Sequence, residues 1–385
     1  MLLRVAAIHL LALTVVFGVA ANEPRQIRET GSVFVGSSGC KSSSCHGGAG
    51  PKRSQYITWS QKDFHTKAYA ILLDARSTRI AQTLQIAEPA TNAPACTVCH
   101  SPFQSVAPNR ITHMEHSDEG VSCETCHGAA GGWLRGHTRP DWTYNTRVAA
   151  GMRDLRNIYV RANACVACHQ YLEPKLLHAG HPDLFFELDG QSVAEPKHWP
   201  KGEPWSGLRE WLTGQAVALR EMSWALASEP QTDEFSNARW DGLAWLCATA
   251  TAAASIPSPV TQPPSAPTRS DFTSMQMQAD ALARRASNSN WSDSSARSLL
   301  ASLASTDAEF TPKGTANQLL GQRAKRLVLA LDRLAHALGQ SRGARLKIDA
   351  ELNQLFQDVR TLDAFDAIGF AAHLQAFRAA LDKSG

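Results

Sequence analysis

The 385-residue sequence lacks the features that define several large classes of protein. After residue 21, no run is both long and apolar enough to cross a bilayer. No Ser-His-Asp set, glycine-rich phosphate-binding loop or zinc-hydrolase motif rises above background. The formal net charge is only +3, which gives no argument for a basic nucleic-acid-binding surface. We therefore expect no membrane span in the mature protein and no nucleic-acid partner.

Cysteine is also scarce, at nine residues, but eight of the nine form four pairs that are each followed by histidine. Three pairs have the spacing Cys-x-x-Cys-His, which is the attachment motif of c-type haem. The two thiols become thioethers on the porphyrin, and the histidine binds the iron from one face. The sequence thus predicts four haem c groups, attached through Cys40 and Cys45, Cys96 and Cys99, Cys123 and Cys126, and Cys165 and Cys168, with His46, His100, His127 and His169 as iron ligands.

Zinc sites and small redox loops are the alternatives for such cysteine pairs. Neither requires a histidine after the second cysteine of every pair. The first motif differs because four residues, rather than two, separate Cys40 from Cys45. A loop disulfide followed by an unrelated His46 remains an alternative for that motif.

The N-terminus has the pattern of a secretory signal peptide, with a positive start, an apolar run and small residues before Asn22. We expect residues 1–21 to be removed and the mature protein to be exported to the periplasm. The sequence has no cysteine near the cleavage point, so we expect no lipid anchor there. The periplasm is also where bacteria attach c-type haem.

Histidine density and apolar periodicity divide the rest of the chain. Residues 22–204 hold all four motifs and most of the histidines, and we expect a loop-rich haem domain with short helices and little sheet. The apolar periodicity of residues 205–254 predicts a helical extension that packs on the haem domain. Five prolines in residues 255–270 predict a linker. Residues 271–385 carry several apolar stripes at helical spacing, which predict an antiparallel helical bundle. The expected fold is therefore mainly α.

The second ligand of each iron must come from outside the motifs. The haem domain offers more free histidines than four irons need, and Met114 is a further alternative ligand. His113 and His116 are three residues apart, so we expect only one of the two to bind iron. The spacing alone leaves the assignment open among His65, His113, His116, His137, His178, His181 and His198.

Several segments resemble the multihaem c-type cytochromes of the cytochrome c-554 type. They are Gly120–Gly128 with Trp133, Leu134 and His137, then Gly180–Leu188 with His198 and Trp199, and Trp59-Ser60 with His65. The resemblance covers roughly residues 33–250, and it implies closely stacked haems with mostly bis-histidine irons that carry electrons. It implies His65, His137 and His181 as distal ligands, with His116 and His198 as weaker candidates.

The sequence departs from such chains around Cys247, where related proteins often carry a further motif. Here a second cysteine and a histidine are absent. Cys247 is either the remnant of a lost fifth site or an ordinary buried cysteine. The C-terminal 130 or so residues gain no support from the resemblance.

The leading functional interpretation is an electron carrier that passes electrons between a redox donor and an acceptor. The alternative is a reductase of a small nitrogen compound, which needs one iron with an open face. No Cys-x-x-Cys-Lys motif is present to support that alternative. In a third interpretation, the chain is a subunit that docks on a larger complex through its C-terminal helices.

Overall fold

The computed structural model describes residues 32–112, 117–170, 172–199, 205–229, 232–254, 256–311, 316–343 and 345–384. Within these ranges the chain is mainly helical, and β pairing is limited to one isolated bridge between Phe34 and Ile111. The expected mainly α fold is confirmed. The α-helices are α1 (Gln55–Lys62), α2 (Ala68–Ile71), α3 (Ala75–Thr83), α4 (Pro94–His100), α5 (Cys123–His127), α6 (Tyr144–Ala149), α7 (Ile158–His169), α8 (Pro174–His178), α9 (Leu188–Ala194), α10 (Ser206–Ser228), α11 (Glu234–Ala253), α12 (Arg269–Ala286), α13 (Asp293–Ala304), α14 (Asn317–Arg342), α15 (Asp349–Asp358) and α16 (Ala367–Ser384). The 3-10 helices are η2 (Ser37–Gly39), η3 (Phe64–Lys67), η4 (Pro102–Ser105), η5 (Pro108–Arg110), η6 (Ser117–Glu119), η7 (Ala130–Gly132), η8 (Asp307–Phe310) and η9 (Leu362–Ala364).

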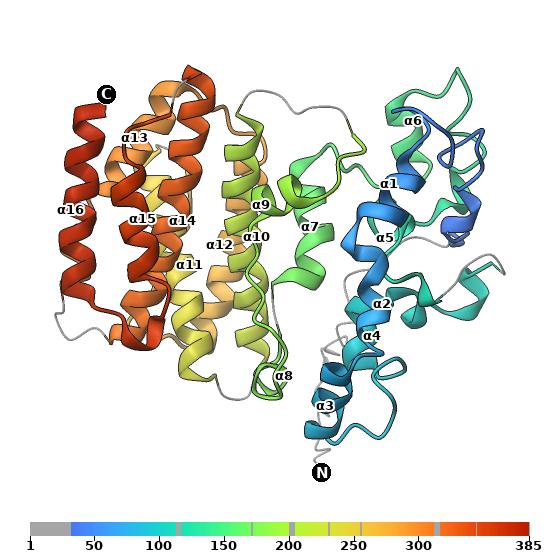
Figure 1. Ribbon diagram of the computed structural model, residues 1–385, viewed down its shortest axis with the longest axis horizontal. Helices are drawn as coiled ribbons and strands as arrows, with labels where there is room; N and C mark the ends of the chain where they lie inside the picture. The colour runs from blue at the N-terminus through green and yellow to red at the C-terminus, as the bar shows by residue number, and fades with distance from the viewer. Residues whose placement is uncertain are drawn as a thin grey trace, which may run out of the picture.

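The two halves of the molecule differ in helix length. Helices α1–α6 are short and joined by long loops on one side of the molecule, whereas α10–α16 lie side by side on the other (Figure 1). Helices α7 and α9 lie between the two groups (Figure 1). Short helices are marginal on their own, so the N-terminal part depends on what packs between them. Of the helices described, none is long and apolar enough to cross a membrane.

The C-terminal helices form a bundle around an extensive apolar core. Helix α10 packs along α12, and α11 packs along α14. The sequence periodicity here is confirmed, because the leucine stripe of α14 faces this core. Its members are each 1 % exposed or less: Leu320, Leu327, Leu331, Leu334 and Leu338.

Helices α10 and α11 thus belong with the helices that follow the proline-rich stretch. Residues 256–268 of that stretch contain no helix, and Val260 is buried against the bundle. A capping box at Thr268, whose hydroxyl and backbone N–H pair with Asp271, then starts α12. The prolines therefore connect two helices of one bundle.

The N-terminal part has only small apolar clusters. One lies around Phe34 and Phe103, and a second around Leu72 and Cys96. Glu124 stabilises this region, because its buried carboxylate accepts N–H bonds from a segment almost 90 residues earlier in the sequence and from the nearby Ala130. The donors are Val35 at 3.0 Å, Gly36 at 2.7 Å and Ala130 at 2.6 Å. Buried hydrogen bonds and small apolar clusters therefore stabilise the described residues of the N-terminal part, rather than one large apolar core.

Candidate haem-binding sites

Local structure presents each regular motif on one helix face. Helix α4 ends at His100, α5 at His127 and α7 at His169. Cysteines three residues apart, with a histidine directly after the second, lie on the same side of such a helix. Pro94 starts α4 at a position where a missing N–H costs nothing, and Asn157 caps α7 by accepting the N–H of Val160.

The first motif reaches a similar arrangement by a different route. Its two additional residues form a tight turn after η2, in which the Cys45 N–H donates to the Ser42 carbonyl at 2.9 Å. The His46 N–H then donates to the carbonyl of Cys40 at 3.2 Å. The longer spacing is thus folded back so that His46 lies beside its cysteines. The thiols of Cys40 and Cys45 are free in the structure, as thioether formation requires.

Each motif histidine lies opposite one histidine from outside the motifs. The two rings are neighbours, and in every case the partner comes from a distant part of the sequence. Their interplanar angles run from 15° to 86°. The ring centroids are 6.1 Å apart for His46 and His137, 6.0 Å for His169 and His65, 6.3 Å for His100 and His181, and 6.3 Å for His127 and His198.

This spacing fits a metal ion between the rings. A metal–imidazole bond is about 2.0 Å, and a ring nitrogen lies about 1.1 Å from its centroid, so two axial imidazoles have centroids about 6.2 Å apart. Rotation about the shared axis leaves the interplanar angle free, which agrees with its wide range. Direct aromatic contact falls in the same distance range, but it does not explain why each motif histidine has one partner of the other kind.

A polar group left over in the first site also fits a haem. Trp133 is 7 % exposed, and its ring lies 5.4 Å from that of His137. Its Nε1–H has no hydrogen-bond partner among the described residues. Buried indole N–H groups normally have an acceptor, so this donor suits an acidic group such as a haem propionate.

The remaining histidines are arranged differently. His178 is exposed at the end of α8. His336 bonds the Gln340 side chain, and His373 lies 2.8 Å from Asp358. His113, Met114 and His116 lie outside the described residues.

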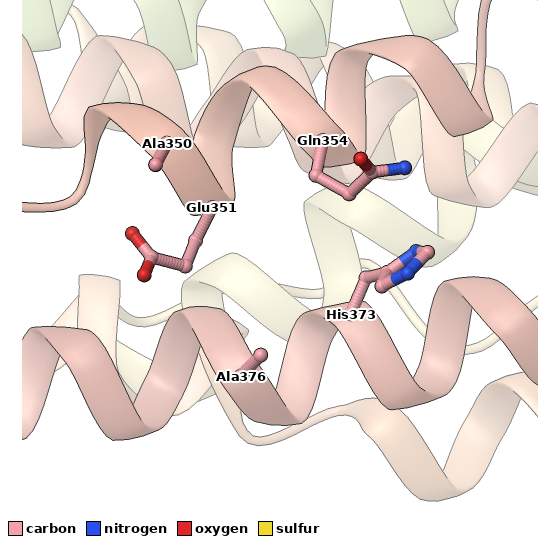
Figure 2. Close-up of a pocket in the computed structure, with 5 residues that line it drawn as sticks. All are labelled: Ala350, Glu351, Gln354, His373 and Ala376. Carbon is pink, nitrogen blue, oxygen red and sulfur yellow. The ribbon is translucent and has the colours of Figure 1, made fainter.

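A shallow cavity of about 200 Å³ lies between α15 and α16, away from every motif. Figure 2 shows it with Glu351, Gln354 and His373 at its rim, and Ala350 and Ala376 complete the lining. It has no cysteine in its lining. We therefore assign it no haem.

Burial favours the neutral form of three motif imidazoles, which is the form that binds metal. Burial lowers the pKa of His127 to about 4 and that of His169 to about 4. Burial likewise lowers the pKa of His100. A neutral imidazole is the ligating form, so burial favours binding at neutral pH.

Most of the paired histidines present Nδ1 to a neutral acceptor. His46 Nδ1 faces the Gln55 side-chain oxygen at 3.0 Å. His100 Nδ1 faces the Ala68 carbonyl at 2.9 Å. Such bonds fix the tautomer and leave Nε2 for iron. The same role falls to the carbonyls of Leu134 for His137, Pro182 for His181 and Pro196 for His198.

His65 differs from these paired histidines, because carboxylates face its ring. Its Nδ1 lies 2.9 Å from Asp63 Oδ1 and 3.4 Å from Glu195 Oε2. Hydrogen bonds to Asp63 and then to Glu195 raise the pKa of His65 to about 10. The three side chains also have the composition of a small metal-binding group.

Contacts between motif cysteines give the four sites a spatial order. The thiol of Cys40 interacts with that of Cys123, and His46 acts on His127. Cys126 lies close enough to Cys165 for their charges to interact. Cys99 interacts with Cys168. Along this row the motifs follow the order first, third, fourth, second.

Residues 40–128 match the family model of cytochrome c554 and c-prime. The segment that carries the first three motifs is thus similar to the c-type cytochromes of that family. Such a similarity implies covalently bound haem c and electron transfer with redox partners. No curated protein and no solved structure matches the chain.

The similarity to this cytochrome family leaves the ligand set to be argued from the chain itself. The matched segment includes the first three motifs and His65, but it ends before His137, His181 and His198. Of these three, His198 is the one that the sequence supports least as a distal ligand, because little besides the adjacent Trp199 indicates that role. The fourth motif and every residue of the bundle also lie beyond the match. Attachment and ligation at the four motifs remain predictions.

Cys247 lies inside the bundle. It is fully buried in the core of α11, among residues of α10 and α12. Burial raises the pKa of its thiol to about 12, so it is kept protonated. This environment is typical of a cysteine that serves as a small apolar side chain.

Proposed function

We propose that this cytochrome is an exported electron carrier with four haem c groups, each held between two histidines. The observation that carries the proposal is the fourfold pairing of one motif histidine with one other histidine at 6.0–6.3 Å. The axial pairs would be His46 with His137, His100 with His181, His127 with His198 and His169 with His65. Cys40, Cys45, Cys96, Cys99, Cys123, Cys126, Cys165 and Cys168 would attach the haems.

Two axial imidazoles favour a carrier over a catalyst. Haem c supplies an iron that alternates between ferric and ferrous states. With a histidine on each face, no coordination position is left for a substrate. The chain's own contribution is to fix both rings of the His46–His137 and His100–His181 pairs, and the distal ring of the other two pairs, through contacts at Nδ1, so that these rings need not move when the charge changes. A reductase would need one of the four pairs to be open.

The row of motifs also suits electron transfer. Thiols of the first and third motifs interact, as do thiols of the fourth and second, and Cys126 of the third motif is near enough to Cys165 of the fourth for their charges to interact. Cys45, in the first motif at one end of the row, is exposed. We propose that donor and acceptor proteins approach opposite ends of this row.

Export is part of the proposal. The signal-peptide pattern of residues 1–21 supports it, although those residues lie outside the described ranges. Attachment of haem c in bacteria takes place outside the inner membrane, so four motifs imply passage across it.

The test is a haem count with a spin-state spectrum of the purified holoprotein. Intact mass should give four haems per chain, and electron paramagnetic resonance of the oxidised protein should show low-spin iron. A strong high-spin signal would favour the reductase alternative. Fewer than four haems in protein whose first motif is unmodified would return Cys40 and Cys45 to the disulfide interpretation.

A further inference from the structure

A single segment, residues 181–198, passes between the motif-bearing part and the bundle. We call it the strap. It begins at His181, which faces the second motif, and ends at His198, which faces the third. Between these two histidines it contributes Glu195, which contacts His65 at the fourth site. One continuous segment therefore reaches three of the four sites.

Apolar side chains fix the middle of the strap in the bundle. Phe186 and Leu188 are fully buried in a core that also contains residues of α7, α10, α11 and α12. Helix α10 comes so close that a Cβ on Gly214 would lie 2.8 Å from the Leu188 Cβ. A glycine at this position allows the strap to pack directly on the helix backbone.

Arginines of two bundle helices hold the strap backbone and carboxylates on both sides of this apolar anchor. Arg239 of α11 lies 2.9 Å from the Asp183 carboxylate and donates to the Leu184 carbonyl at 2.6 Å. Arg333 of α14 lies 2.6 Å from the Asp189 carboxylate. Each contact joins residues that are far apart in sequence, so together they set the position of the strap along its own length.

A buried charge lies at the centre of this arrangement. Arg326 of α14 is 2 % exposed, and its guanidinium lies 3.6 Å from the centroid of the Phe185 ring. It donates to Gln215 at 3.2 Å and lies 3.5 Å from the Glu187 carboxylate, which Gln215 also contacts at 2.8 Å. Buried ion pairs add little net stability compared with apolar residues, and their best-attested use is to specify one register.

We infer that the C-terminal bundle is the scaffold that sets the position of the strap, and that Arg326 and Arg333 are positioning residues for the ligands His181 and His198. The inference rests on the proposed function, because it assumes that these two histidines bind iron. A shift of the strap by one residue would carry both rings away from their motif partners. The other two pairs, whose distal histidines lie outside the strap, would keep their ligands.

The experiment compares two substitutions on α14 in the full-length holoprotein. Arg333→Gln removes the contact to Asp189 at a side chain that is 30 % exposed, so we expect the protein to fold. Arg323→Gln is the matched control, because the ion pair that Arg323 makes is with Asp241 of α11, which lies outside the strap. Both replace one arginine of the same helix; Arg333→Gln also removes an ion pair to the adjacent Asp332 of α14, which is not part of the strap.

For Arg333→Gln we expect a high-spin signal from up to two of the four irons, and new binding of carbon monoxide or cyanide at those irons. Arg323→Gln should keep all four irons low-spin. Arg333→Lys should restore the low-spin spectrum at least in part, because it retains the charge. A double variant, Glu187→Gln with Arg326→Met, removes both buried charges without leaving one unpaired, and it should give the same high-spin signal.

The inference would be overturned if Arg333→Gln and the double variant Glu187→Gln with Arg326→Met both gave low-spin spectra equal to that of Arg323→Gln. A high-spin signal from all four irons would also overturn it, because that indicates general unfolding. Failure of the proposed function would look different. It would appear in the unmodified protein, as a missing haem or a high-spin iron before any substitution is made.

Discussion

Replacement of Asp63 by Asn should raise the reduction potential of the haem that we assign to His65 and His169. Asp63 Oδ1 lies 2.9 Å from His65 Nδ1, and its side chain is only 7 % exposed. Ferric haem has one more positive charge than ferrous haem, so a neighbouring carboxylate favours the ferric state. A carboxylate also strengthens the imidazole as a donor to iron, which acts in the same direction.

The magnitude follows from the distance and the burial. A unit charge about 7 Å from the iron, at an effective dielectric constant of about 20, contributes about 2 kcal/mol. Since a tenfold change in a one-electron equilibrium is about 59 mV, the expected rise is about 100 mV. Glu195 is farther away, at 3.4 Å, and 25 % exposed, so Glu195→Gln should give a smaller rise.

The assay is a spectroelectrochemical titration of the four haems before and after the substitution. Asn retains the ability to cap η3, which Asp63 does by accepting the His65 N–H, so the local fold should persist. Gln55→Glu is the complementary variant, because it places a carboxylate beside His46 and should lower the potential of that haem.

A shift of less than about 20 mV for Asp63→Asn, a twofold change in the ratio of reduced to oxidised haem, would refute the reasoning. A chelator should leave the potentials of the unmodified protein unchanged. A change on chelation would instead indicate that Asp63, His65 and Glu195 hold a cation.

Three further predictions concern stability and ligand choice. Glu124→Gln should lower the free energy of unfolding by about 3 kcal/mol in chemical denaturation, because a buried carboxylate that accepts several N–H bonds is lost. Burial alone would raise the pKa of Asp280, but hydrogen bonds from a tyrosine and two arginines outweigh it and hold the pKa at about 2. This pKa lies below that of an aspartate in the unfolded chain, so Asp280 stabilises the fold above about pH 4 and loses this effect as the pH falls toward 2. The difference in free energy of unfolding between the unmodified protein and Asp280→Asn should therefore become smaller from pH 6 to pH 3. His181→Ala should convert one iron to the high-spin state, whereas His178→Ala should leave the spectrum unchanged; equal spectra would contradict our assignment.

The sequence is informative about the motif half of each site because that half is local. Two cysteines and a histidine within five residues lie together in almost any helical turn, so spacing alone predicts the arrangement seen at α4, α5 and the end of α7. The long helices are equally local. The apolar stripe around Leu331 predicts α14 because it follows the helical period, and the structure confirms that helix.

The distal half of each site depends on contacts that no local pattern contains. His178 and His181 are three positions apart in the sequence, yet of the two only the ring of His181 lies beside that of a motif histidine. His198 carried the weaker signal, and its ring faces that of His127. What separates these histidines is the course of the strap, which the bundle arginines fix from positions such as Arg333. Arginine on a helix surface has no sequence signature that would indicate such a contact.

The sequence likewise does not indicate that Glu195 contacts His65, because this contact also depends on the course of the strap. An acidic residue at the end of α9 is an ordinary surface feature in the sequence. The fold carries it to His65, where it becomes part of a charged environment around one site. The histidine-rich composition was a signal that ring partners were needed, but it contained no information on their acidic neighbours.

The most direct test of the account is a quantitative spin count on the oxidised holoprotein, normalised to haem content and protein mass. The account predicts four haems per chain and four low-spin irons, each with two histidine ligands. A chain with four haems of which one is high-spin and binds exogenous ligands would contradict the claim that all four histidine pairs hold iron.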